Sequence, residues 1–75
     1  MYSTTIVEEY SGMTLLEIIS TLKNTDAFKS KMGSAFTETT CLVTLDDEIF
    51  AYPSLGSTIA RTGQLMKVIP LVSGG

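Results

Sequence analysis

One stretch of the chain carries the hydrophobic pattern of an amphipathic helix. Its large apolar residues recur at i, i+3, i+4 and i+7 and therefore share one helical face: Leu15, Ile18, Ile19 and Leu22. Thr14 and Glu17 just before this face have the spacing of a capping box, in which each side chain accepts a hydrogen bond from the other residue's backbone N–H. The pattern predicts a helix from 15 to about 23, followed by another turn or two over 27–32 that ends at Gly33.

Four other stretches have the composition of strands, with many β-branched, aromatic or alternating apolar residues. The strands are predicted over residues 3–10, 36–45, 48–52 and 65–72. In the second of them the apolar residues that share one face are Cys41, Val43 and Leu45. In the last of them Pro70 has no backbone N–H to donate to a neighbouring strand. We therefore expect the end of this strand to lie at an edge of the sheet or to leave the sheet.

The segments between the strands carry turn residues. Ser11-Gly12 ends the first strand, Asp46-Asp47 forms a hairpin turn, and residues 62–64 form another turn. Residues 53–57 are expected to be a loop, anchored to the core by Leu55 and Ile59. The order strand, helix, strand, strand, loop, strand predicts an α+β domain with one helix packed on a mixed sheet.

Length and composition narrow the function. A chain of 75 residues holds one domain with a small core. It has no histidine and one cysteine, which excludes histidine-based catalysis, histidine metal ligands and an internal disulfide. We therefore expect a binding or carrier domain and not an enzyme, with no bound cofactor or metal.

Charge and hydropathy restrict the classes of partner and the cellular location that we expect. The net charge is −3 and the basic residues are scattered, which disfavours nucleic acid. No apolar run reaches the ~18 residues of a membrane span, and the N-terminus has no signal core, so we expect no membrane partner and a cytoplasmic location.

Three groups of side chains invite a chemical interpretation, but each has a simpler structural one. Cys41 alternates with apolar strand residues and is expected to be a buried thiol. The acids Asp46, Asp47 and Glu48 are expected to be solvated at a turn, with a cation site as the alternative. The methionines are expected to fill the core, namely Met13, Met32 and Met66.

The end of the chain resembles the closing signature of ubiquitin-like β-grasp sulfur carriers, such as the small subunit of molybdopterin synthase and the thiamine sulfur carrier. The shared features are a glycine-containing turn at Gly63, an apolar strand, Pro70, the small residue Ser73 and Gly74-Gly75. The junction over 11–17 is similar to the family's junction between the second strand and the helix. Residues 16–32 resemble the ubiquitin-like domain of lambda-type phage tail assembly proteins. Bacterial ubiquitin-like modifiers are related to these groups.

The resemblance covers residues 4–75, and it implies a β-grasp domain over 1–72 with a tail over 73–75. It departs from the family at Gln64, where the usual residue is aspartate. It also departs at the front of the chain, because only one strand fits before Thr14 and the family's first, central strand is missing.

In this family an activating ATPase consumes ATP to adenylate the C-terminal carboxylate. The resemblance therefore implies that Gly75 and Gly74 are the activated end, that Val72 and Ser73 help the partner to recognise it, and that a protease can process it. The expected function is a protein modifier of a bacterial conjugation system, a class that includes antiphage systems. The alternatives are a sulfur carrier with a C-terminal thiocarboxylate, and a self-assembling or tail-assembly module that fills its missing strand by strand exchange.

Overall fold

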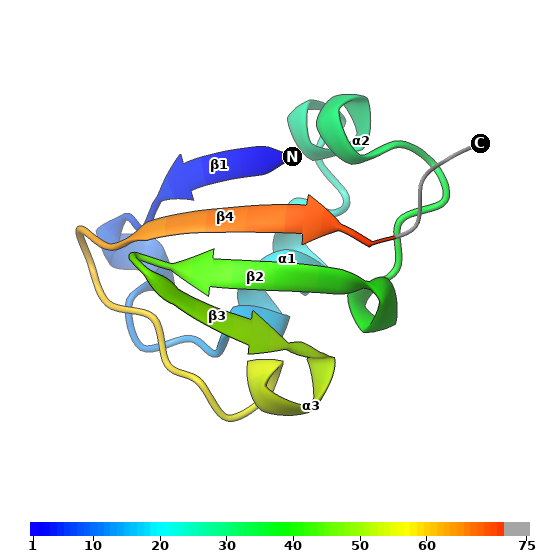
Figure 1. The fold of residues 1–75 in the computed structure, drawn as a ribbon. Coiled ribbons are helices and arrows are strands. Elements are labelled where there is room, and N and C mark those ends of the chain that lie inside the picture. Colours follow the sequence, from blue (N-terminus) through cyan, green and yellow to red (C-terminus); the bar gives the residue numbers. More distant parts are fainter. Residues whose placement is uncertain (72–75) are drawn as a thin grey trace.

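The computed structural model describes residues 1–71, and the strands in this part of the chain form one sheet (Figure 1). The four strands are β1 (Tyr2–Thr5), β2 (Cys41–Leu45), β3 (Glu48–Ala51) and β4 (Leu65–Pro70). They lie in the order β1-β4-β2-β3, and each neighbouring pair is antiparallel. The α+β class is as predicted. The predicted mixed sheet is wrong, because residues 1–71 contain only antiparallel pairs.

The antiparallel sheet results from the position of β1. Tyr2 lies opposite Val68 and Thr5 lies opposite Leu65, so β1 occupies the place directly beside β4. The pairing continues past the strand, where the Ile6 N–H donates to the Gln64 carbonyl at 2.8 Å. Within the described residues the sheet is therefore continuous. The prediction of strand exchange rests on a strand missing beside β4, and β1 occupies that place.

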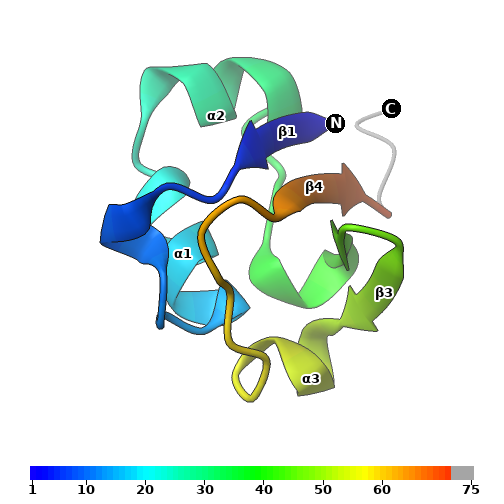
Figure 2. The same cartoon turned by 90° about the vertical axis from the view of Figure 1, so that its left-hand side faces the viewer.

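Two helices cover one face of this sheet, as the two views in Figures 1 and 2 show. They are α1 (Leu15–Leu22) and α2 (Asp26–Met32), and a short helix α3 (Tyr52–Leu55) follows β3. The capping box of α1 is confirmed: the Glu17 N–H donates to Thr14 Oγ1 at 3.1 Å, and the Thr14 N–H donates to Glu17 Oε1 at 2.9 Å. The helical turns predicted over 27–32 and their end at Gly33 are confirmed as α2. The expectation of a single helix on the sheet is wrong, because α2 is a separate helix and α3 replaces part of a predicted loop.

The predicted strands are too long at several ends. The first strand ends at Thr5, and Glu8–Tyr10 forms a 3₁₀ turn, η1. The second begins only at Cys41, because Glu38–Thr40 forms another 3₁₀ turn, η2. The polar residues of these turns have no partner strand to pair with, so β-propensity alone does not extend the sheet.

The predicted loop at 53–57 also differs from the structure. The chain becomes helical at Tyr52, and Pro53 lies in the first turn of this helix. Proline is tolerated there because a backbone N–H in the first turn has no partner within the helix. Leu55 at the end of α3 is fully buried, as expected of a core anchor. Ile59 is 45% exposed, so its predicted anchoring role is wrong.

The core lies between the sheet and the helices. The predicted inner face of β2 is confirmed, because Cys41, Val43 and Leu45 are buried while the residues between them are not. Met66 of β4 is fully buried, Met32 is 8% exposed, and Met13 packs against the same cluster, as expected of core methionines. No helix described within residues 1–71 has both the length and the apolar character that crossing a membrane requires.

Replacing Thr14 with alanine should lower the free energy of unfolding by about 1 kcal/mol, because it removes the hydroxyl that accepts from the Glu17 N–H. Urea denaturation followed by circular dichroism measures this difference. Thr21→Ala is the matched control, because it removes an exposed hydroxyl from the interior of the same helix and should leave stability unchanged or slightly higher. Equal effects of the two substitutions would contradict a special role for the cap.

Candidate functional site

The residues predicted to be activated or recognised are Val72, Ser73, Gly74 and Gly75, and all four lie outside the described residues. The structure does describe the base from which this segment continues. That base consists of the end of β4, the turn η2 beside it, and the hollow between η2 and α2.

β4 is an inner strand that is paired along both edges. Val68 lies between Tyr2 of β1 and Val43 of β2, and its side chain is fully buried. At the end of the strand Pro70 lies opposite Cys41, and the Leu71 N–H donates to the Thr40 carbonyl at 3.0 Å. The backbone is therefore held by neighbouring segments up to Leu71, four residues before Gly75.

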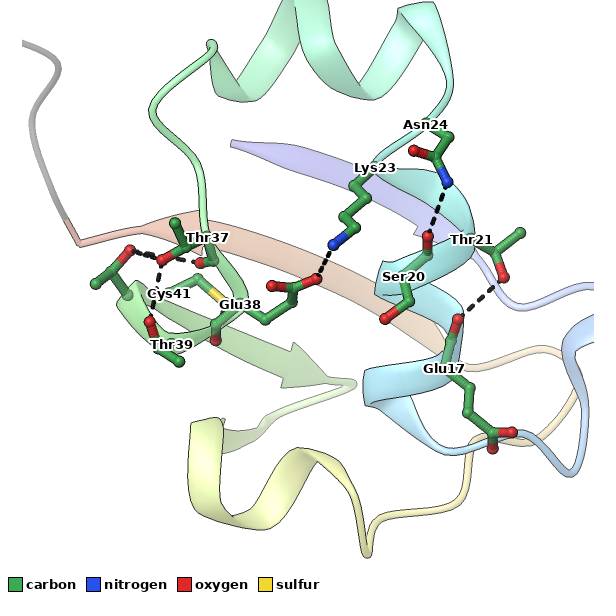
Figure 3. A network of polar contacts seen from close by, with 10 residues as sticks. Glu17, Ser20, Thr21, Lys23, Asn24, Thr37, Glu38, Thr39 and Cys41 are labelled. Carbon is green, nitrogen blue, oxygen red and sulfur yellow. Dashed lines mark hydrogen bonds and ion pairs between the residues drawn. The ribbon is translucent and has the colours of Figure 1, made fainter.

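The turn η2 that receives this hydrogen bond is ordered by its own hydroxyl groups (Figure 3). Thr37 Oγ1 lies 2.8 Å from the hydroxyl of Thr40 and 3.1 Å from that of Thr39. The Thr40 N–H also donates to the Thr37 carbonyl at 3.2 Å. These local bonds hold the Thr40 carbonyl in position, and so help to fix where the chain leaves the sheet.

An ion pair links η2 to the end of α1. The Lys23 ammonium at the end of α1 contacts the carboxylate of Glu38 in η2 (Figure 3). This contact lowers the pKa of the Glu38 carboxyl below its ordinary value. The ion pair therefore ties the turn that carries Thr40 to the helical layer.

Cys41 is a buried thiol, as the sequence predicts. Its side chain is 1% exposed, and Sγ donates to the Glu38 carbonyl at 3.5 Å. Burial raises the pKa of the Cys41 thiol, and the negative charge of Glu38 raises it further. A neutral, covered thiol is a poor nucleophile, so the chemistry of Cys41 does not define the site.

The acidic turn between β2 and β3 has a structural role. Asp46 has a positive φ of 54°, and its carboxylate accepts from the Leu65 N–H at 3.0 Å. Its own N–H donates to the Leu65 carbonyl at 2.8 Å. No group of three or more potential metal-ligating side chains occurs among the described residues, so nothing here favours the alternative of a cation site.

Sequence reasoning missed a groove beside the base of the tail. Two adjoining hollows share Gly33, Ser34 and Phe36. One also reaches Met32, Thr40 and Pro70, and the other reaches Lys23, Asn24, Phe28 and Lys29. Because a strand is predicted from Phe36 onward, no hollow is expected beside this segment. The small residues Gly33-Ser34-Ala35 and the polar residues after Phe36 are the sequence signal for an irregular segment.

Comparison with known proteins identifies no relative: no protein-family model, curated protein or solved structure matches the chain. Its chemistry has to be inferred from its own residues.

The Cys41 thiol should react with a thiol reagent at least about tenfold more slowly in the folded protein than in urea, because it is covered and protonated. The test is the rate of labelling at neutral pH with an aromatic disulfide reagent. The control is the double variant Cys41→Ala, Thr39→Cys, which moves the thiol to an exposed position two residues away and should label rapidly. Equal labelling rates for the two folded proteins would contradict the burial of Cys41.

The Lys23–Glu38 ion pair should stabilise the fold at neutral pH and not in acid. The folded protein lowers the pKa of the Glu38 carboxyl, so the ion pair stabilises the fold at pH values above the pKa that Glu38 has in the unfolded chain. This stabilisation is lost as the pH falls through the folded-state pKa of Glu38. Lys23→Met should lower the free energy of unfolding by less than about 1 kcal/mol at about pH 7, because the ammonium is partly exposed, and by almost nothing at about pH 3.

Urea denaturation at both pH values measures this effect. Lys31→Met is the control, because Lys31 is exposed on α2 and takes part in no ion pair among the described residues. A loss of stability on Lys23→Met that is equally large at both pH values would show that packing of the lysine stem, and not the ion pair, is responsible.

Proposed function

We propose that this chain is a ubiquitin-like protein modifier. In this proposal the carboxylate of Gly75, either as the end of the chain or after a protease cleaves behind it, is adenylated by an ATP-consuming partner and then transferred to a target protein. The observation that carries the proposal is the position of β4. An inner strand, held on both edges, leads within four residues to Gly74-Gly75.

The order of the elements supports a β-grasp-like arrangement. A strand, a helix, a hairpin, a short helix and a final inner strand follow one another, and α1 packs on one face of the sheet. The missing first strand is compatible with this arrangement. The strand that precedes α1 lies beside the last strand and antiparallel to it, which is the direction expected of the returning strand of the usual hairpin.

The reaction needs only the carboxylate from this chain. A carboxylate oxygen attacks the α-phosphorus of ATP, and pyrophosphate leaves. An amine or thiol then attacks the carbonyl carbon of the acyl-adenylate, and AMP leaves. Gly74 and Gly75 suit this chemistry, because residues without a β-carbon fit narrow channels and adopt backbone angles that are closed to other residues. The partner supplies the nucleotide site.

The sulfur-carrier alternative shares the adenylation step and differs in the nucleophile. A sulfur donor would convert the Gly75 carboxylate into a thiocarboxylate, whereas a modifier forms an amide with a target. The assembly alternative stays a prediction, but within residues 1–71 β1 fills the place beside β4, so the strand exchange that it invokes has no gap to fill there.

The test is to express the chain with a short N-terminal epitope in its native cells and purify it under denaturing conditions. Trypsin cleaves after Lys67, so a modified target lysine should carry residues 68–75 as a branch, which mass spectrometry identifies. Removal of Gly74-Gly75 should abolish the branched peptides. Asp47→Asn, an exposed change at the opposite end of the sheet, is the matched control and should preserve them.

The outcomes separate the alternatives. Branched peptides that require Gly74-Gly75 support a modifier. An intact chain in which one oxygen at Gly75 is replaced by sulfur indicates a sulfur carrier instead. If neither product is found in cells that contain the wild-type chain, both forms of C-terminal activation are wrong.

A further inference from the structure

Two adjoining hollows lie beside η2, and Gly33, Ser34 and Phe36 line both of them. We refer to the two together as the groove. One end of the groove is bordered by Lys23 and Lys29, and the other by Thr40 and Pro70. Pro70 is the last residue of β4, so the groove adjoins the base of the tail.

The floor of this groove is apolar and packed. Phe36 meets Phe28 edge to face with ring centroids 5.0 Å apart, and Phe28 contacts Tyr2 of β1 at the same centroid distance. Gly33 ends α2 with a φ of 81°, a conformation that turns the chain sharply toward Ser34. The aromatic side of the groove is therefore held by contacts that continue into the core.

The charges of the molecule are separated along the sheet. Five of the eight acids lie at the end away from Pro70, where Arg61 is the nearby basic residue: Glu8, Glu9, Asp46, Asp47 and Glu48. The acids on the groove side are Asp26, in the first turn of α2, and Glu38. Lys29 borders the groove at the other end and takes part in no ion pair among residues 1–71. Lys23 is already paired with Glu38. In a chain of net charge −3, the groove thus offers a lysine to an anionic partner.

We infer that this groove binds a segment of the adenylating enzyme that carries a carboxylate for Lys29 and an apolar side chain for Phe36 and Met32. The inference rests on the proposed function and names the surface by which the enzyme holds this chain. A partner seated beside Pro70 is close to the reacting end, because the four residues that follow Leu71 reach at most about 14 Å.

The test measures ATP–pyrophosphate exchange by an adenylating ATPase captured with this chain from its native cells, with this chain as the varied substrate. Lys29→Glu should raise the KM for the chain on the order of tenfold and leave kcat nearly unchanged, because a like charge now faces the carboxylate. Lys31→Glu makes the same charge change in the same helix outside the groove, and should change the KM less than about twofold.

A second pair of variants tests the apolar end. Ser34→Trp should fill the groove and raise the KM, whereas Ser57→Trp places the same side chain at an exposed site outside the groove and should not. Thermal denaturation of all four variants shows whether each is folded. Restoring the KM of Lys29→Glu by changing one acid of the enzyme to lysine would support the direct contact.

The remaining outcomes overturn the inference in distinguishable ways. Exchange with the wild-type chain but an unchanged KM for Lys29→Glu and Ser34→Trp would refute the groove and leave the proposed function intact. A lower KM for Ser34→Trp would instead indicate that the groove holds the chain's own last residues. If the wild-type chain supports no exchange, the proposed function and the inference both fail.

Discussion

β4 is hydrogen-bonded along both edges, to β1 on one side and to β2 on the other. Its inward residues Met66 and Val68 are fully buried beneath the helical layer. A domain of this size buries only about 60% of the surface that its unfolded chain exposes, so it has little core to spare. If β1 did not pair with β4, both the ladder and the contact of the Tyr2 ring with Phe28 would be lost. The four-residue strand at the N-terminus is therefore as necessary as the longer ones.

The pairing with β2 continues to the end of β4, where Pro70 lies opposite Cys41, and it gives that end its fixed position. Thr40 accepts from Leu71 because η2 brings its carbonyl beside the strand, and η2 is held in turn by its threonine hydroxyls and by the Lys23–Glu38 ion pair. These are weak interactions taken singly, and most of them are exposed. Their effect is geometric, because together they determine the direction in which the chain continues toward Gly75.

Local features of the fold could be predicted from the sequence, and features set by distant contacts could not. The capping box of Thr14 and Glu17 lies within four residues, so its spacing alone predicts it. The burial of Cys41 and Val43 follows from strict alternation within one strand. The antiparallel sense of β1 depends on a partner more than sixty residues away, which no local pattern encodes.

Predictability was equally uneven at the candidate site. Gly74 and Gly75 stand out in the sequence, and they remain a prediction because they lie beyond the described residues. The groove beside Pro70 has no sequence motif, because it is assembled from α2, the irregular segment after Gly33 and the end of β4. Only folding brings Lys29 and Phe36 to the same surface as Pro70.

The separation of charge along the sheet gives this arrangement a direction. The acids of η1 and of the β2–β3 turn lie at the end opposite Pro70, so an acidic surface of a partner is repelled there and is attracted at the end that carries Lys29. Such steering depends on the electrostatic field of all the charges and is weakened by salt. The apolar contact with Phe36 acts only at short range and is not weakened by salt. In the proposed complex, the field would favour the end of the molecule that carries Lys29, and the contact with Phe36 would position the enzyme segment once it has bound. Both would place that segment beside the strand that leads to Gly75.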